Sequence, residues 1–327
     1  MNTRLLSWLY KLLIAGTTIA VLMLHAWIET IDATTASQGI VLNQVGYLPS
    51  AAKIALIRNA EAPAEAVAQL INTADDSVAL TLEPSALAID SSSGDGLQQL
   101  DFSGVRRSGS YRCQYGDLES VPFTIATNPY TEATRLLLRS YYLQRCGIEL
   151  AAPETGIYHP PCHLHDGRMA HSDAINDAEV HLAAAGGWHD AGDYGKYVST
   201  AAVTVGRLLS VYEQAPERFW DGQLKIPESG NGMPDLLDEM QVGLDWMLRM
   251  QRADGAVYRK LSGTSWPIDL TPDEDTQTRY VYGISTPETA KFAGAMAQAS
   301  RIFQPFDEAI AQQYLAAAVI AWAYLAT

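Results

Sequence analysis

The spacing of hydrophobic residues along the chain changes near residue 128. Upstream, residues 39–125 hold short runs rich in Val, Ile and Leu, separated by Pro, Asn and Asp. Such runs are typical of short β-strands joined by turns. One run alternates Tyr111, Cys113 and Tyr115 with polar neighbours, so one face of that strand, including Cys113, should be buried. The pattern predicts a small all-β sandwich.

Downstream of residue 128 the hydrophobic spacing becomes helical. The clearest segment begins with Ser285 and Glu288 at the spacing of a capping box, with Pro287 in the first turn. Apolar residues at helical spacing then form one face: Phe292, Ala295, Met296, Ala299, Ile302 and Phe303. The predicted helices span residues 130–146, 196–216, 234–252, 286–304 and 307–326. The long loops between them, 147–190 and 253–285, should carry the binding chemistry.

The first 37 residues read as a targeting segment. Arg4 and Lys11 precede an apolar run from Leu12 to Ile28, and small residues follow it. This order predicts a secretory signal peptide. The alternative is a retained membrane anchor, although the run is slightly shorter than the ~20 residues that a spanning helix needs. In both cases the remaining chain should be secreted, periplasmic or at the cell surface, and a membrane is a partner only if the segment stays uncleaved.

Composition and charge narrow the class of protein. A length of 327 residues predicts roughly two domains, and 48% hydrophobic residues exclude a disordered chain. The chain has 22 Lys and Arg against 37 Asp and Glu, a net charge of −15. This balance disfavours nucleic acid as a partner, because phosphate binding needs clustered basic residues. Three cysteines are too few for a disulfide-stapled scaffold.

The sequence GGWHDAGDYGKY at residues 186–197 is the densest candidate for catalysis. Asp190 and Asp193 lie three residues apart in a glycine-rich loop that leads into a predicted helix. Two nearby carboxylates can hold one water molecule and remove its proton. The alternative is that both aspartates cap the helix or complete a turn, since this spacing alone is a weak signal.

Two cysteines and two histidines could form a metal site: Cys146, Cys162, His163 and His189. Thiolates and imidazoles suit zinc, and two of each are a common tetrahedral set. A disulfide between Cys146 and Cys162 is the alternative in an exported protein. Three nearby side chains could replace one of the ligands: His159, His165 and Asp166.

Longer motifs resemble a known family. GGWHDAGDYGKYVS, followed by IPESGNGMPDLLDEMQVGLDWMLRMQ, resembles glycoside hydrolase family 9, the inverting endoglucanase and cellulase family. VLNQVGYLP resembles the start of the immunoglobulin-like domain that precedes the catalytic domain in one branch. DGAVYRKL and TRYVYGISTPETAKFAGAMAQASRIFQPFD follow in the family's order. The resemblance covers about residues 38–327.

The resemblance implies a multidomain fold. Residues 38–127 would be an all-β immunoglobulin-like sandwich, and residues 128–327 the N-terminal part of an all-α (α/α)6 toroid. Only about half of that toroid would be present, because the family's general acid, a cleft histidine and a calcium site are expected beyond Thr327. The chain therefore looks C-terminally truncated. Four glutamates of the helical region were considered, and none matches the context of the acid: Glu228, Glu239, Glu274 and Glu288.

The resemblance also implies roles for site residues. Asp193 would be the general base, and Asp190 would help to hold the attacking water. YLQRCG, HPPCH and GGWHD resemble the structural zinc site of the immunoglobulin-bearing branch, which favours zinc on the four residues named above. Tyr194 and Trp266 are candidate sugar platforms. The acidic cluster Asp273, Glu274 and Asp275 is expected to be a solvated loop rather than a calcium site.

The function implied is inverting hydrolysis of β-1,4-glucosidic bonds in cellulose or related β-glucans, with a polysaccharide or oligosaccharide as partner. Lacking the acid, the chain alone should be weakly active or inactive. One alternative is an exported module that binds polysaccharide without cleaving it. Another is an exo-acting family member on cellodextrins or glucosamine oligomers. A zinc hydrolase is a third, but it needs an open coordination position.

Overall fold

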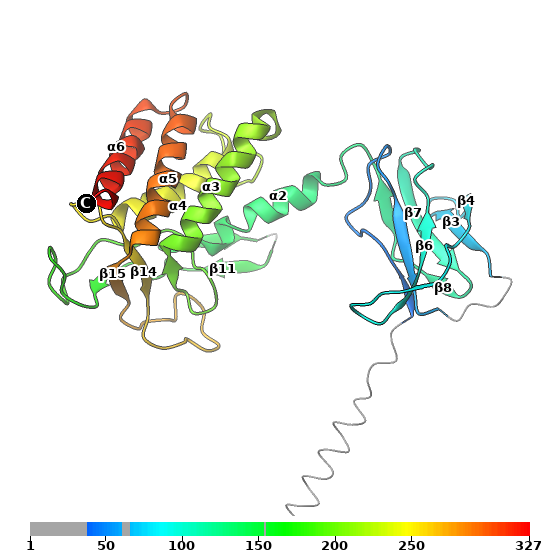
Figure 1. Cartoon of the computed structure of the whole chain (residues 1–327), viewed down its shortest axis with the longest axis horizontal. Coiled ribbons are helices and arrows are strands. Elements are labelled where there is room, and N and C mark those ends of the chain that lie inside the picture. Colours follow the sequence, from blue (N-terminus) through cyan, green and yellow to red (C-terminus); the bar gives the residue numbers. More distant parts are fainter. Residues whose placement is uncertain (1–37, 61–65, 154) are drawn as a thin grey trace, which may run out of the picture. The chain divides into compact units, whose positions relative to one another are not determined.

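The computed structural model describes residues 38–60, 66–153 and 155–327, so the predicted signal or anchor at 1–37 lies outside the described residues. The chain divides into two compact units, of which one ends at Thr131 and the other runs from Glu132 to Thr327 (Figure 1). The boundary that we predicted falls after residue 127. Within the described ranges, no helix combines the length and apolarity needed to cross a membrane.

The first unit consists of two antiparallel sheets. One has the order β1 (Gly39–Val41), β2 (Ile54–Arg58), β6 (Gly96–Asp101) and β5 (Ala88–Ile89). The other has the order β4 (Val78–Leu82), β3 (Ala68–Asn72), β7 (Gly109–Tyr115) and β8 (Leu118–Glu119), and β9 (Phe123–Ile125) also pairs with β7. The inward residues of both sheets form one hydrophobic core, as in a sandwich.

Strand β7 confirms the predicted alternation. Tyr111, Cys113 and Tyr115 are buried, while their neighbours are only partly covered. Burial raises the pKa of the Cys113 thiol to about 12, so this cysteine is an inert core residue. Strand β6 was not predicted, because Gln98 and Gln99 interrupt its hydrophobic pattern, and β5, with two residues, was not predicted either.

The second unit is built on helices. They are α2 (Thr131–Arg139), α3 (Val198–Gln214), α4 (Asp235–Arg249), α5 (Thr286–Phe303) and α6 (Glu308–Leu325), with short 3-10 turns at Tyr142–Gln144 and Pro216–Arg218. In Figure 1, α3 to α6 lie side by side, and α5 packs against both α3 and α6. The predicted apolar face of α5 is buried in the core between them.

Two helix predictions need correction. The predicted helix 130–146 ends at Arg139, because the chain after Gln144 turns to pair with residues near Trp188. At the start of α5, Ser285 is the N-cap residue as predicted, but its hydroxyl hydrogen-bonds to the Glu288 carboxylate instead of capping a backbone N–H.

Short strands join the ends of these helices. One sheet has the order β12 (Arg168–Met169), β15 (Tyr280–Ile284), β14 (Tyr258–Ser262) and β13 (Lys196–Tyr197). A separate hairpin pairs β10 (Leu150–Ala152) with β11 (Ile157–His159). Residues 196 and 197, predicted as the first turn of a helix, are instead β13, which leads directly into α3.

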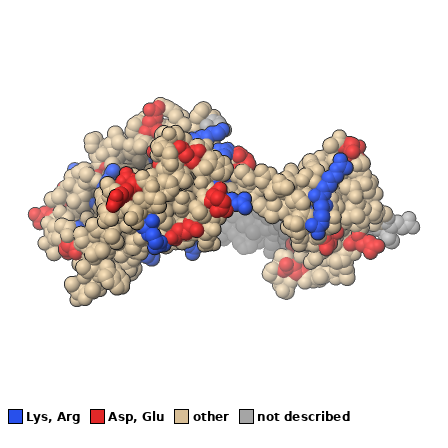
Figure 2. Space-filling model, turned by 90° about the horizontal axis from the view of Figure 1, so that it is seen from above, with Lys and Arg blue, Asp and Glu red and all other residues tan. Residues whose placement is uncertain are grey.

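Charged residues are dispersed over the surface that Figure 2 shows. On this face Lys and Arg lie among Asp and Glu rather than in one large patch of either sign. The sequence has 37 acidic and 22 basic residues, but the acidic ones do not form a single patch on this face.

Candidate active site and metal centre

Two segments that are far apart in the sequence meet in the helical unit. The Cys146 N–H donates to the carbonyl of Gly187 at 2.8 Å, and the His189 N–H donates to the carbonyl of Gln144 at 2.8 Å. This pairing sets Cys146 and His189 beside each other. Gly187 permits it, because a Cβ at that position would lie 2.6 Å from Cγ of Trp246.

Buried Glu239 on α4 anchors both segments. Trp188 Nε1 donates to Glu239 Oε1 at 2.8 Å, and Arg145 Nη2 lies 2.9 Å from Glu239 Oε2. Arg145 also binds Glu228 at 2.8 Å. Removing one partner from such a buried network leaves an uncompensated charge, which is strongly destabilising. The residues just before Cys146 and His189 are thus fixed by the same helix.

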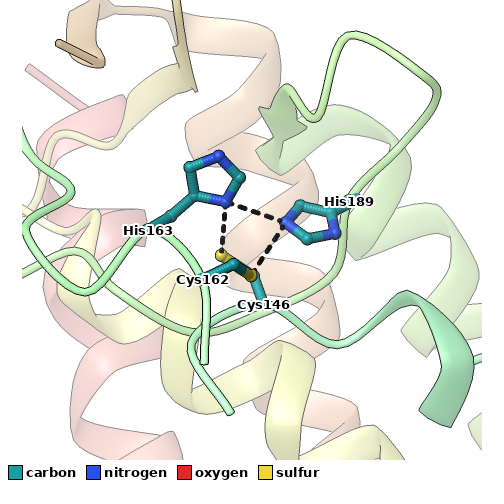
Figure 3. Close-up of side chains that lie close together, drawn as sticks. All are labelled: Cys146, Cys162, His163 and His189. Atoms are coloured by element: carbon teal, nitrogen blue, oxygen red, sulfur yellow. Dashed lines mark hydrogen bonds between the residues drawn. The ribbon is translucent and has the colours of Figure 1, made fainter. Parts of the chain in front are cut away.

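The four predicted metal ligands lie together (Figure 3). Their ligand atoms are within 4.8 Å of one another, and all four side chains are buried or nearly so. Cys146 Sγ is 3.8 Å from His163 Nδ1, Cys162 Sγ is 3.8 Å from His189 Nε2, and the two ring nitrogens are 3.3 Å apart.

These separations fit a tetrahedral zinc site. Zinc binds sulfur at roughly 2.3 Å and imidazole nitrogen at roughly 2.0 Å, so the edges of its tetrahedron are about 3.3–3.8 Å. The cysteines among the described residues are free, so the alternative Cys146–Cys162 disulfide is not formed. Asp166, considered as a substitute ligand, is instead paired with Lys196 at 2.7 Å.

The protonation states of Cys146 and His189 favour a cation. Burial lowers the pKa of His189, so its imidazole is held in the neutral form that binds metal. A hydrogen bond from Cys162 lowers the pKa of Cys146, and the Lys196 ammonium, 3.7 Å from Cys146 Sγ, favours the same thiolate. The pKa of Cys162 is raised by that hydrogen bond and by burial.

Asp275 is packed behind one of the candidate ligands. Its Oδ2 lies 3.4 Å from Nε2 of His163, whose Nδ1 faces the cluster. A carboxylate in this position fixes the tautomer and orientation of a metal-binding histidine. The prediction that residues 273–275 form a solvated acidic loop is therefore wrong for Asp275, which is buried, whereas Glu274 is exposed.

Tyr194, a predicted sugar platform, lies against the cluster. Its ring centroid is 5.1 Å from that of His189 and 5.8 Å from that of His163, and its hydroxyl donates to the carbonyl of Leu270. The side chain is thus engaged on both its ring and its hydroxyl, and its role as a sugar platform stays a prediction.

The two candidate catalytic aspartates lie in the loop just before β13. Tyr197 donates its hydroxyl to Asp193 Oδ2 at 3.0 Å, and the Gly195 N–H donates to Asp193 Oδ1 at 3.0 Å. The Thr200 hydroxyl donates to Asp190 Oδ1 at 2.7 Å. Both carboxylates are therefore held by the first turn of α3 or the loop before it.

Each aspartate lines a small cavity. Asp193 shares one of about 170 Å³ with Trp266, Tyr197 and Lys260, and Trp266 is 60% exposed there. Asp190 lines another of about 240 Å³ beside Trp188. A larger hollow of about 630 Å³ lies between residues 161–168 and 273–279, on the side of the metal cluster. The structure thus brings Asp193 and Trp266 together on one cavity.

Sequence reasoning missed the groups that support these residues. Lys196, Tyr197 and Asp275 were not singled out as partners. Lys196 and Tyr197 were predicted to begin a helix, so the strand alternation that points them to opposite sides could not be found from the sequence. That Asp275 reaches His163, 112 residues earlier in the chain, could not be found from spacing.

Comparison with known proteins agrees with this architecture. A sequence profile of Glycosyl hydrolase family 9 matches residues 130–327, and a profile of the cellulase N-terminal ig-like domain matches residues 35–120. Endoglucanase D of Acetivibrio thermocellus is 33% identical over 291 residues, which cover 88% of this chain and 45% of that protein.

Solved structures give the same result. A metagenome-derived glycoside hydrolase family 9 endoglucanase is 45% identical with a TM-score of 0.81, over 88% of this chain and 54% of that one. A Zn-binding triple mutant of a GH family 9 endoglucanase is 40% identical with a TM-score of 0.80, over 85% of this chain and 52% of that one. The chain spans about half the length of the relatives that it matches.

The family and fold class predicted from the sequence are confirmed. The first unit is an immunoglobulin-like β-domain, and the helical unit matches part of the (α/α)6 barrel of its structural neighbours. The chain belongs to glycosyl hydrolase family 9.

Proposed function

We propose that this chain carries the water-activating side of an inverting β-1,4-glucan hydrolase. Asp193 removes a proton from the attacking water, and Asp190 helps to hold that water. In an inverting enzyme the base acts on the face of the sugar opposite the departing oxygen, and a separate acid protonates that oxygen. The substrate proposed is cellulose or a related β-glucan, as the endoglucanase names of the relatives suggest.

One observation supports this proposal most. The cavity that contains Asp193 is lined by an exposed tryptophan, Trp266, and its walls carry polar side chains such as Lys260 and Ser262. A tryptophan face stacks on the apolar face of a pyranose, and polar groups can bind its hydroxyls. Asp193 is thereby close to a surface suited to a sugar ring.

We further propose that none of the four glutamates considered above is the acid. Glu228 and Glu239 bind Arg145, and Glu239 is fully buried. Glu274 accepts two hydrogen bonds from Thr271, and Glu288 is bonded to Ser285. Without an acid the sugar oxygen must leave as a poor anion, a loss typically of about 10²–10⁴-fold. The 327-residue chain alone should therefore hydrolyse glucan weakly or not at all.

We also propose that Cys146, Cys162, His163 and His189 bind a structural zinc ion. Four protein ligands leave no open position, so the ion would supply structure rather than an activated water. His189 directly precedes Asp190, and the ion would thus fix one end of the loop that holds both aspartates. The closed set of four protein ligands argues against the zinc hydrolase alternative, which needs an open position.

Export of the protein stays a prediction.

Hydrolysis of cellotetraose and carboxymethylcellulose tests the function. The protein is expressed from the complete reading frame that contains these 327 residues, and the 327-residue chain is assayed in parallel. We expect reducing sugar from the complete product and a loss of about 10²–10⁴-fold in Asp193→Ala. Unchanged hydrolysis in Asp193→Ala would contradict the role of Asp193. Robust hydrolysis by the 327-residue chain would contradict the proposal that this chain alone is weakly active or inactive.

A further inference from the structure

Tyr197 makes the most specific side-chain contact of the candidate base. Its hydroxyl donates to Asp193 Oδ2, while the Gly195 N–H donates to Oδ1, each at 3.0 Å. Each oxygen of the carboxylate therefore has one fixed donor. Two donors on different oxygens set the plane of the carboxylate and leave the remaining lone pairs to other groups.

The ring of Tyr197 is itself held on several sides. In the sheet, Tyr197 pairs with Lys260, and Lys260 pairs with Tyr282. The Lys260 ammonium lies between the two rings, 5.6 Å from the centroid of Tyr197 and 4.6 Å from that of Tyr282. Cation–π contacts of this kind are attractive. The ring is therefore oriented by its neighbours as well as by its hydroxyl.

Gly195 leaves the space that the Tyr197 ring occupies. A Cβ at position 195 would lie 2.8 Å from Cε2 and 2.9 Å from the hydroxyl oxygen of Tyr197, closer than real side chains approach. The same glycine supplies the N–H that binds Asp193. A single small residue thus permits both hydrogen bonds to the carboxylate.

We propose that Tyr197 is a positioning residue for Asp193, which holds the carboxylate turned toward the cavity shared with Trp266. This inference rests on the proposed function, in which Asp193 is the base. A donor on each oxygen fixes the orientation of the carboxylate and leaves its other lone pairs for a water in the cavity. Tyr197 therefore orients Asp193 for proton removal from that water.

The tyrosine is suited to this role because it remains a donor. Burial raises the pKa of Tyr197, and its hydrogen bond to Asp193 raises it further. The other charged groups that act on the hydroxyl are Asp190 in the same loop and Arg279 next to β15, while Lys260 on β14 faces the ring. The hydroxyl thus keeps its proton throughout the neutral range.

The first test compares Tyr197→Phe with the matched variant Tyr282→Phe in the complete protein. Both remove one hydroxyl and keep the ring that faces Lys260. We expect kcat of Tyr197→Phe to fall by about 10- to 100-fold, with KM within about twofold, because a hydrogen bond to a charged group is lost. Tyr282→Phe should behave as the wild type.

The second test needs no activity and uses crystals of the complete protein. In Tyr197→Phe the plane of the Asp193 carboxylate should turn, because Oδ2 loses the donor that fixes it. In Tyr282→Phe the carboxylate should lie as in the wild type. If Tyr197→Phe does not fold, Gly195→Ala, whose Cβ displaces the ring, should turn the carboxylate as well.

An unchanged Asp193 carboxylate in Tyr197→Phe, or an equal turn in Tyr282→Phe, would overturn the inference. Failure of the proposed function gives a different result, since Asp193→Ala would then keep its hydrolytic activity. Loss of activity in Asp193→Ala together with wild-type kcat in Tyr197→Phe would leave Asp193 as the base and remove Tyr197 from its support.

Discussion

Two adjacent residues of β13 face two different environments. The side chain of Lys196 is fully buried, 2.7 Å from Asp166 and 3.7 Å from Cys146 Sγ, on the side of the metal cluster. The side chain of Tyr197 is half-buried and binds Asp193 beside an open cavity. Successive residues of a strand point to opposite sides, so one short strand separates the two sites.

The two sides differ in the partners of their carboxylates. On the Lys196 side, Asp166 is ion-paired with both Lys196 and Arg279, so the buried charges are compensated. On the Tyr197 side, the side-chain donors to Asp190 and Asp193 are the neutral hydroxyls of Thr200 and Tyr197. The closed side, which holds Lys196, can stabilise the loop that carries both aspartates. The open side, which holds Tyr197, can exchange protons with water.

The largest expected effect is on the open side. Asp193→Asn should lower kcat/KM by about 10²–10⁴-fold, because an amide cannot take a proton from water. The melting temperature should change little, since the amide oxygen can still accept from the Gly195 N–H while the amide NH2 can donate to the Tyr197 hydroxyl oxygen. Reducing-sugar assays and calorimetry on the same sample check both results. A large fall in the melting temperature of Asp193→Asn, alongside the loss of activity, would show that catalysis and stability are not divided between the two sides.

On the closed side, substitution of a metal ligand should mainly lower zinc binding and stability. Cys146→Ser should abolish stoichiometric zinc binding and lower the unfolding free energy by at least about 3 kcal/mol, because metal binding is linked to folding. Metal analysis and thermal unfolding measure these effects. Cys113→Ala, in the β-domain, is the control and should keep one zinc per chain. Retention of zinc in Cys146→Ser would contradict the ligand set.

A smaller effect is expected behind the metal ligands. Asp275→Asn should weaken zinc binding by about 10- to 100-fold, because the amide polarises His163 less than the carboxylate does. Competition with a chromophoric chelator measures the affinity. Glu274→Gln, the exposed neighbour, should bind zinc as the wild type does. Equal zinc affinities in the wild type, Asp275→Asn and Glu274→Gln would mean that the Asp275 carboxylate does not contribute to zinc binding.

The smallest effect concerns stability away from both sites. Burial first, and nearby carboxylates second, raise the pKa of Asp238 to about 6, above its unfolded value of about 3.9. The protonated form therefore stabilises the fold below pH ~4, and this contribution is lost as pH rises through about 6.

Asp238→Asn should remove this pH dependence. Because its side chain stays neutral, the variant should be more stable than the wild type at pH 7 by about 2 kcal/mol, with denaturant unfolding as the measurement. Asp235→Asn is a contrasting variant. Asp235 accepts hydrogen bonds from Gly222, Leu224 and Ser229, so its loss should destabilise the protein at every pH. A steeper pH dependence of the free energy of unfolding in Asp238→Asn than in the wild type would contradict the raised pKa of Asp238.

Periodicity was sufficient to predict the long helices and most strands of the β-domain. The four helices from α3 to α6 begin and end within a few residues of the predicted positions, because each has an extended apolar face. The two-residue strands β12 and β13 could not be predicted, since so short a strand is defined by its partner rather than by its own pattern.

The candidate site was predictable only for residues that are close in sequence or belong to a family motif. Asp190 and Asp193 lie in one loop, and the cysteines and histidines were recognised through their resemblance to a zinc site. Asp275 and Lys260 come from other loops and strands, and they reach His163 and Tyr197 through tertiary pairing. No pattern within either segment indicates such a partner.

The stereochemistry of hydrolysis tests the central claim most directly. Cellotetraose is added to the protein expressed from the complete reading frame, and the anomeric protons of the first products are followed by NMR. Attack by a water that Asp193 activates predicts the α-anomer as the initial product, absent in Asp193→Ala. An initial β-anomer, or an α-anomer formed equally by Asp193→Ala, would contradict the account.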